Sequence, residues 1–340
     1  MHILLTGGLG FIGSHVAVLL GNDESYEITI IDNLSNSSFD VYDNILKLTK
    51  FPQHFRFVEG DVTNIDTLEK IFHAKQIDGI IHFASLKSVG ESIQQPLNYY
   101  SQNLNGTINL LEMMEKYNCG KFIFSSSATV YGTQDPPLFE TNQTGVGLTN
   151  PYGQTKYFQE QILQDFSLVY PEKEITLLRY FNPVGAHPSG LIGEDPNGIP
   201  NNLFPYILRV ACCQYNELSI FGDDYDTPDG TCIRDFIHVM DLAEGHVAAI
   251  QYSKKGTNVY NLGTGQGVSV MELVKSFEKV NGISVPYKIA GRRPGDIVSV
   301  YSDATKAKEY LHWETKRSVE DICKDGYNFI MTKRCDRCDH

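Results

Sequence analysis

The chain has 340 residues, of which 41% are hydrophobic and 20% charged, as in ordinary globular proteins. Its formal net charge of −13 argues against nucleic acid or an anionic membrane as a partner, because either needs a basic face. No apolar stretch reaches the ~20 residues of a membrane span, and Met1 leads directly into a strand rather than a signal peptide. Seven cysteines without an extracellular signature indicate reduced thiols in a cytoplasmic protein.

Short apolar runs alternate with helical stretches through the first half of the chain. Six of these runs indicate buried strands: residues 3–5, 28–31, 55–58, 80–83, 122–124 and 175–178. Their near-continuous apolarity is typical of a parallel sheet covered by helices on both faces. The sequence therefore predicts an α/β fold with a doubly wound, Rossmann-type sheet, whose ligand site lies at the carboxyl ends of the strands.

The composition of the chain changes after about residue 181. Residues 182–205 contain five prolines and several glycines, which indicates a loop-rich segment. A helical pattern returns at residues 239–250, followed by a strand pattern at 259–262. We therefore expect a first domain of residues 1–181, to which the chain returns around 236–262, and a smaller C-terminal α/β lobe of residues 182–340.

The last nine residues, 332–340, are polar and include Cys335, Cys338 and His340. Two thiols and an imidazole can bind zinc, but a closed structural site needs four ligands. The other interpretation is a frayed terminus. We expect no resident metal in this protein.

A glycine motif follows the first strand. Gly8, Gly10 and Gly13 fit G-x-G-x-x-G, which lets backbone N–H groups at a helix N-terminus approach a pyrophosphate. Asp32 follows Gly10 by 22 residues, where a carboxylate accepts hydrogen bonds from ribose hydroxyls. Residues 33–38 offer no Arg or Lys for a 2′-phosphate, so the pattern favours NAD over NADP. The alternative for Asp32 is an ordinary turn carboxylate.

A second group suits hydride chemistry at a carbinol carbon. Tyr152 and Lys156 share a helix face at i and i+4, and Ser127 ends a predicted strand 25 residues earlier. For a phenol with a pKa of ~10 to act as a base near neutrality, its pKa must fall by ~3 units, or ~4 kcal/mol. Lys156 and a nicotinamide ring can favour the phenolate. The alternative is a surface tyrosine and lysine beside a capping serine, and Tyr117 with Lys121 shows that this spacing also arises by chance.

Longer motifs run nearly from end to end of the chain, at residues 82–87, 124–132, 151–153, 179–186, 198–203, 234–241 and 292–296. Through these motifs the chain resembles the UDP-glucose 4-epimerases, a branch of the extended short-chain dehydrogenase/reductase family. The resemblance implies that Tyr152 is the acid/base, with Lys156 and Ser127 beside it. Hydride then passes from C4 of the sugar to NAD and returns to the other face of a 4-keto intermediate, which interconverts UDP-galactose and UDP-glucose in galactose metabolism.

The resemblance also implies two sets of ligand contacts. The expected NAD contacts are Gly7, Gly10, Phe11, Ile12, Gly13, Asp32, Asn33, Leu34, Ser35, Asn36, Ser37, Asp61, Val62, Phe83, Ala84, Ser85, Lys87, Gln102, Tyr152, Lys156 and Tyr180. The expected UDP-sugar contacts are Lys87, Ser127, Tyr152, Phe181, Asn182, Asn202, Leu203, Ser219, Ile220, Phe221, Arg234, Arg293, Asp296 and Val300. Gln102 stands where these relatives often have Asn.

Other activities of the family begin with the same oxidation. In the 4,6-dehydratases an Asp-Glu pair precedes Val-Tyr-Gly, whereas this chain has Ala128 and Thr129, and the decarboxylases commonly have Glu at the position of Thr129. Elimination and decarboxylation are therefore disfavoured. A non-catalytic dinucleotide sensor is the alternative from another class, but such relatives tend to lose the tyrosine or the lysine.

Two further expectations rest on the resemblance. Val300 occupies a position near the sugar's 2-substituent where strict epimerases often have Tyr, so we expect activity on UDP-N-acetylgalactosamine and UDP-N-acetylglucosamine as well. Residues 96–117 and 152–170 correspond to helices that pair across a two-fold axis, so we expect a homodimer.

Overall fold

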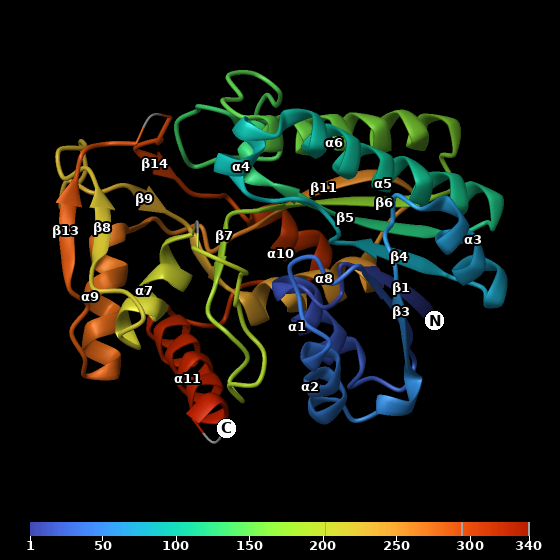
Figure 1. The fold of residues 1–340 in the computed structure, drawn as a ribbon. Helices are drawn as coiled ribbons and strands as arrows, with labels where there is room; N and C mark the ends of the chain where they lie inside the picture. Colours follow the sequence, from blue (N-terminus) through green and yellow to red (C-terminus); the bar gives the residue numbers. More distant parts are fainter. Residues whose placement is uncertain (201, 294, 339–340) are drawn as a thin grey trace.

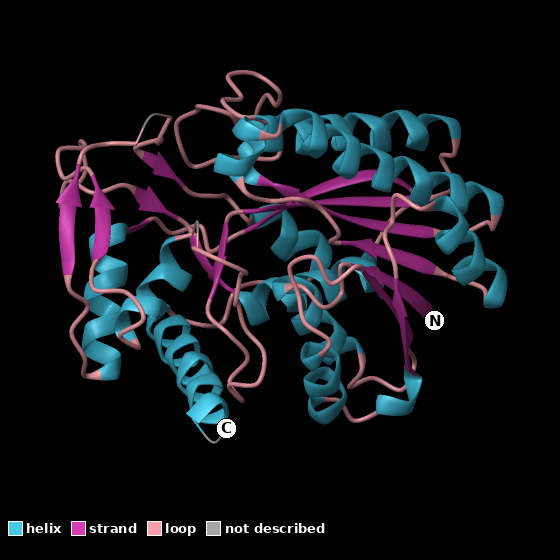
Figure 2. Cartoon of the chain, in the orientation of Figure 1, coloured by secondary structure: helices cyan, strands magenta, loops and turns pink. Residues whose placement is uncertain are grey.

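A seven-stranded parallel sheet forms the larger lobe of the protein (Figures 1 and 2). The computed structural model describes residues 1–200, 202–293 and 295–338, with side chains up to Lys333. The strand order is β11-β6-β5-β4-β1-β2-β3. The strands are β1 (His2–Thr6), β2 (Glu27–Asp32), β3 (Phe55–Glu59), β4 (Gly79–His82), β5 (Lys121–Ser127), β6 (Glu174–Tyr180) and β11 (Gly256–Leu262). The predicted doubly wound α/β fold is confirmed.

Helices cover both faces of this sheet because its strands are apolar on both sides. On β1, Ile3 and Leu5 pack into one buried cluster with α1 (Phe11–Leu20) and α8 (Val239–Tyr252). Leu4 points the other way, into a cluster with α3 (Ile65–Ala74), α5 (Pro96–Lys116) and α6 (Pro151–Val169). The sheet is thus held rigidly between two apolar layers, which fixes the positions of the strand ends.

The strand order reverses at β1, whose neighbours are β2 and β4. In open α/β sheets, ligands bind outside the carboxyl ends of the strands at such a switch point. The segments that leave these ends here are the glycine loop after β1, residue 83 onward after β4, and the 3₁₀ turn η2 (Ala128–Tyr131) after β5. Short elements beside the sheet are α2 (Asp40–Leu48), η1 (Pro52–His54) and α4 (Val89–Gln94).

The smaller lobe has its own buried core, which contains Phe204, Phe277 and Ile330. Its strand pairs are β8 (Leu218–Phe221) with β13 (Tyr287–Ala290) and β7 (Asn182–Val184) with β10 (Phe236–His238). A three-stranded sheet joins β9 (Ile233–Arg234) to β12 (Val268–Ser269) and β14 (Ser299–Val300). The helices of this lobe are α7 (Leu203–Ala211), α9 (Val270–Asn281) and α11 (Val319–Cys338), whereas α10 (Thr305–Leu311) packs through Ala307 and Leu311 into the core of the larger lobe.

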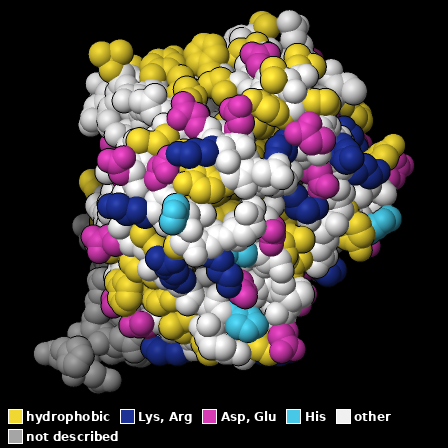
Figure 3. All heavy atoms as spheres, turned by 90° about the vertical axis from the view of Figure 1, so that its right-hand side faces the viewer, with side chains coloured by type: hydrophobic (Ala, Val, Ile, Leu, Met, Phe, Trp, Pro, Cys, Tyr) yellow, Lys and Arg dark blue, Asp and Glu magenta, His cyan; other side chains and the backbone are white. Residues whose placement is uncertain are grey.

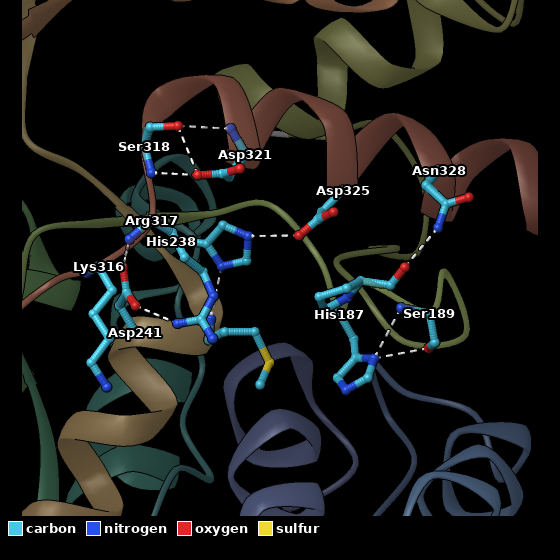
Figure 4. A network of polar contacts seen from close by, with 12 residues as sticks. His187, Ser189, His238, Asp241, Lys316, Arg317, Ser318, Asp321, Asp325 and Asn328 are labelled. Carbon is cyan, nitrogen blue, oxygen red and sulfur yellow. Dashed lines mark hydrogen bonds and ion pairs between the residues drawn. The ribbon is translucent and has the colours of Figure 1, made fainter.

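Polar contacts join α11 to α8 and to the loop after β7 (Figure 4). Asp241, fully buried on the first turn of α8, accepts hydrogen bonds from the backbone N–H groups of Lys316 and Arg317 at 3.1 and 3.0 Å. The Arg317 guanidinium pairs with the same carboxylate. His238 accepts from a backbone N–H through Nδ1, so its Nε2 donates to Asp325 on α11, 3.2 Å away. These contacts fix α11 against the larger lobe.

The polar end of the chain is helical as far as Cys338, because α11 extends to that residue. The frayed terminus stays a prediction. The zinc alternative for Cys335, Cys338 and His340 lies outside the described side chains. Among the side chains that the structure describes, no group of three or more His, Cys, Asp or Glu residues could hold a metal ion. In the described part of the chain, no helix has the length and apolarity that a membrane crossing needs.

Candidate active site at the carboxyl ends of the parallel strands

A cavity of about 780 Å³ opens at the carboxyl ends of the parallel strands. Its wall includes Gly7 after β1, Asp32 at the end of β2, Phe83 after β4, and Tyr180 at the end of β6. Every predicted NAD contact lines this cavity except Leu34. Leu34 packs against the buried cluster below and has a φ of 58°. The structure thus brings residues from segments far apart in the sequence to one cavity.

The packing of the glycine loop indicates whether a dinucleotide fits this cavity. A Cβ on Gly13 would lie 2.6 Å from the Gly7 carbonyl oxygen, and one on Gly7, whose φ is +65°, would lie 2.8 Å from the backbone nitrogen of Ala84. No side chain caps the N-terminus of α1, and Phe11 and Ile12 of its first turn line the cavity. Uncapped N–H groups and the positive end of the helix dipole suit a pyrophosphate. The residues present therefore fit a dinucleotide.

Asp32 both organises the loop around it and faces the cavity. One carboxylate oxygen accepts from the Leu9 N–H at 3.0 Å, and the other accepts from the Leu34 N–H and the Ser37 hydroxyl at 3.0 and 2.9 Å.

Two lysines that the local sequence did not indicate, Lys47 and Lys333, also line the cavity. Lys47 donates to an asparagine of its own helix, and Lys333 pairs with Asp195.

Tyr152 and Lys156 lie on the first turns of α6, beside the end of β5. Asn150 caps this helix by accepting from the Gly153 N–H at 2.8 Å, which fixes where α6 begins. Lys156 is buried and donates to the Ser125 carbonyl oxygen at 2.8 Å, and its Nζ lies 5.9 Å from the centre of the Tyr152 ring. Ser127 hydrogen-bonds Tyr152. The predicted catalytic trio is therefore assembled in one place.

Burial governs the titration of these groups. It raises the pKa of the Tyr152 phenol, and the hydrogen bond with Ser127 acts in the opposite direction. It lowers the pKa of Lys156 to about 7, while the Glu160 carboxylate acts to raise it. The sequence predicts that Lys156 lowers the pKa of the phenol, whereas in the structure the cost of burying a phenolate outweighs nearby interactions.

A carboxylate pairs with Lys87, which was predicted to contact both NAD and the UDP-sugar. Lys87 donates a hydrogen bond at 2.9 Å to Glu194, which lies in the loop before α7. Asn202 donates to the same carboxylate at 3.3 Å. Glu194 also lines the cavity, and its side chain is only 7% exposed. Sequence reasoning missed Glu194, which lies in the proline- and glycine-rich segment where no periodic pattern guides a prediction.

Most of the predicted UDP-sugar contacts lie outside the lining of this cavity. Arg234 on β9 lies beside Val300 in the pairing register of β14. Asp296 is 4.0 Å from Arg234 and accepts from Arg293 at 3.1 and 3.3 Å. The Arg293 guanidinium lies 4.8 Å from the centre of the Phe221 ring. Two guanidinium groups with one carboxylate leave a net positive charge, which suits a diphosphate.

The remaining predicted substrate residues lie in three settings. Phe181 belongs to a small buried cluster with Val130, Tyr131 and Leu138, against which Val300 packs. Asn182 is on β7, and its N–H donates to the Asp235 carbonyl oxygen at 2.9 Å. Ile220 is buried in the core of the smaller lobe and Leu203 packs against that core, while Ser219 on β8 is half-buried.

A family model described as GDP-mannose 4,6 dehydratase matches residues 4–326. The UDP-glucose 4-epimerase of Bacillus subtilis (strain 168) is 52% identical over 331 residues, which cover 97% of this chain and 96% of that protein. The crystal structure of UDP-glucose 4-epimerase from Bifidobacterium longum, in complex with NAD⁺ and UDP, superposes with a TM-score of 0.94 at 49% identity, covering 98% of this chain and 99% of that one.

The chain belongs to the UDP-glucose 4-epimerase family. A similar match to a Caenorhabditis elegans UDP-glucose 4-epimerase is 51% identical and covers 97% of each chain. The recognition made from the motifs is confirmed.

Three further polar residues of this family member were not predicted from the sequence. Asn103 on α5 is buried, accepts from the Leu86 N–H at 2.8 Å and donates to Thr155 at 3.0 Å, so it ties the wall of the cavity to α6. Asn103 follows Gln102, which was predicted as an NAD contact where Asn103 was not, and both residues line the cavity. Glu160 and Arg179 form a buried ion pair behind Lys156. The spacing of Lys156 and Glu160, i and i+4, was the one available signal.

Proposed function

We propose that this protein is a UDP-glucose 4-epimerase that interconverts UDP-galactose and UDP-glucose with bound NAD. The observation that supports this best is that Tyr152, which interacts with Ser127, and Lys156 line the same cavity as the glycine loop at the N-terminus of α1. When bound, oxidised NAD accepts the hydride from C4 of the sugar and returns it, and its positive ring favours the phenolate of Tyr152. Incubation of the purified protein with UDP-galactose, followed by quantification of UDP-glucose, tests the proposal.

The proton chemistry belongs to Tyr152. Because burial raises the pKa of its phenol, the resting group is protonated and needs nearby positive charge to act as a base. Lys156 supplies that charge from the next turn of α6. The hydroxyl of Ser127 interacts with the Tyr152 phenol and would hydrogen-bond the same oxygen of the sugar. Tyr152 then takes the proton of the 4-hydroxyl and gives it back after the sugar has presented its other face.

The residues after Ser127 favour epimerisation over elimination. Ala128 has no titratable group, and the hydroxyl of Thr129 is buried without a hydrogen-bond partner among the described residues. Neither side chain can donate and abstract the protons of a dehydration. Although the matching family model has the name of a dehydratase, the first turn after β5 lacks the acid and the base for that reaction.

We also propose that N-acetylated UDP-hexoses are substrates. Val300 is on β14, pairs in register with Arg234 and packs against the cluster that contains Phe181. A valine at this position leaves space for several atoms that a tyrosine would fill. Steric exclusion of the acetamido group is then lost, and discrimination falls to the ~1–3 kcal/mol of an imperfect fit.

A homodimer is the proposed assembly. Large apolar side chains are exposed on α4, α5 and α6, among them Leu97 at 82%, Ile93 at 61% and Phe158 at 40%. Hydrophobic side chains gather along the upper edge of Figure 3, the side on which α5 and α6 lie in Figure 1. The opposite faces of both helices are buried against the sheet through Leu110 and Leu163. Light scattering at micromolar concentration is expected to give twice the mass of the chain, and a monomer would refute the proposal.

We place the protein in the cytoplasm. The support is that Cys119, Cys212, Cys213, Cys232 and Cys323 are free thiols, a state typical of reducing compartments. Fractionation of cells that express the protein tests this location.

A further inference from the structure

A buried ion pair lies behind the proposed catalytic lysine, outside the cavity lining. Glu160 follows Lys156 by one helical turn on the same face of α6 and is 0% exposed. Arg179, on β6, is 4% exposed and donates to both carboxylate oxygens, from Nε at 3.0 Å and from Nη2 at 2.7 Å. This forked geometry holds a carboxylate firmly in one orientation.

The surroundings of Glu160 keep its carboxylate in place. The Ser126 hydroxyl on β5 donates to the oxygen that Arg179 Nε also contacts. Arg179 is itself held, because Nη1 donates to the Tyr131 hydroxyl at 3.1 Å and to the Glu140 carbonyl oxygen at 3.3 Å. An ionised buried carboxylate needs this number of donors.

Lys156 has far less support of its own. Its Nζ donates to a neutral acceptor, the Ser125 carbonyl oxygen, and the centre of the Phe124 ring lies 4.9 Å from Nζ. Burial alone drives the pKa of this lysine downward, and the charge of Glu160 is what opposes the fall. A lysine that lost its proton could not favour the phenolate of Tyr152.

The other groups that face Lys156 do not replace this charge. Tyr152 on the same helix and Tyr180 on β6 have pKa values raised by burial, so both are neutral. His82 on β4 is fully buried, and burial followed by the charge of Lys156 lowers its pKa to about 3, so it is neutral as well. Arg179 is positive and opposes the charge on Lys156, but it is paired with Glu160.

We propose that Glu160 is a positioning residue of the reaction: held by Arg179 and Ser126, its carboxylate places a negative charge one turn behind Lys156 and keeps that lysine charged. The proposal rests on the proposed function, since it explains how Lys156 remains a cation in a buried epimerase site. It assigns no contact between Glu160 and the substrate.

The test measures the titration of Lys156 directly. Wild-type, Glu160→Gln and Arg179→Met proteins, labelled with ¹³C at lysine Cε, are titrated by NMR, and the Lys156→Met protein assigns the resonance. Glu160→Gln is expected to lower the titration midpoint by about one pH unit or more, because two buried cations then lack a partner. Arg179→Met is expected to move it upward, because an unpaired carboxylate then faces the lysine. These opposite signs are not expected from a merely structural role, and either variant alone suffices if the other does not fold.

A neutral control and the pH profile complete the test. Gln159→Leu removes buried hydrogen bonds to Asn103 and Thr107 from the neighbouring position and is expected to leave the midpoint unchanged. In the epimerase assay, the alkaline limb of kcat should move with the midpoint, and Glu160→Asp should restore part of the Glu160→Gln shift. An unchanged midpoint in Glu160→Gln or Arg179→Met would overturn the inference. If the two variants show the opposite shifts but the wild-type protein does not epimerise UDP-galactose, the proposed function is overturned and this inference is not.

Discussion

Lys156 Nζ donates a hydrogen bond to the Ser125 carbonyl oxygen at 2.8 Å, two residues before Ser127 on the same strand. This bond ties the proposed catalytic lysine on α6 to the strand that ends in the proposed catalytic serine. Because β5 and β6 pair in register from Lys121 to Ser127, the same strand also fixes Tyr180 opposite Ser127. The relative positions of the reacting groups therefore depend on the sheet and not on a loop.

Replacing this lysine should stabilise the protein while it damages the reaction. The folded-state pKa of Lys156 is about 7, below its ordinary value of 10.5, so between these pH values the unfolded chain binds more protons than the folded one. Wild-type stability therefore rises with pH through this window. Lys156→Met should have a free energy of unfolding higher by ~2–4 kcal/mol below pH 7, with the difference closing as pH approaches 10.5. Urea unfolding of both proteins at several pH values measures it, and a difference independent of pH would contradict the assigned pKa shift.

The glycine loop should tolerate no side chain at Gly13. An added Cβ would lie 2.6 Å from the Gly7 carbonyl oxygen and 2.8 Å from the Gly8 Cα, so the loop must move. Gly13→Ala should therefore lose most of the NAD that copurifies with the protein, as measured by release of the nucleotide with acid. Gly90→Ala is the matched control, because a Cβ there meets nothing within 4 Å. Equal NAD content in the two variants would show that the loop does not bind the pyrophosphate.

The junction between α8 and α11 should contribute strongly to stability. Asp241→Ala leaves two backbone N–H groups and the Arg317 guanidinium without their partner, and should lower the free energy of unfolding by about 3 kcal/mol. Lys316→Ala is the control, since its side chain is 67% exposed and its ion pair with Glu244 should contribute ~0.5 kcal/mol or less. Urea unfolding with an unchanged m value checks both. Similar losses for the two variants would mean that the buried network has no special role.

Sugar specificity should depend on the volume at position 300. Wild-type protein is expected to convert UDP-galactose and UDP-N-acetylgalactosamine, and Val300→Tyr should lose the acetylated substrate selectively by at least ~10-fold in kcat/KM. Side-by-side kinetics with both substrates decide the matter. Failure of the wild type on the acetylated sugar, with no selective loss in the variant, would rule out this role for Val300.

Local patterns were sufficient to predict the strands of the main sheet, because most of them have an apolar run with buried side chains, although β3 at the edge of the sheet has no buried residue. They could not predict β9, β12 or β14, which have two residues each and exist only through their pairing with one another. The predicted NAD contacts converge because parallel strands share one edge, apart from Leu34, which packs inward. The pairing of Glu160 with Arg179 was out of reach, since it depends on how α6 lies over β6 and not on any local spacing.

The central claim is that the Tyr152 phenol carries the proton in an epimerase reaction. The most direct measurement is the kcat for conversion of UDP-galactose to UDP-glucose by wild-type and Tyr152→Phe proteins whose NAD content has been shown to be equal. The account predicts active wild-type protein and a fall of at least ~10³-fold in the variant, because only the hydroxyl is removed. Wild-type turnover in Tyr152→Phe, or no turnover in the NAD-loaded wild type, would contradict it.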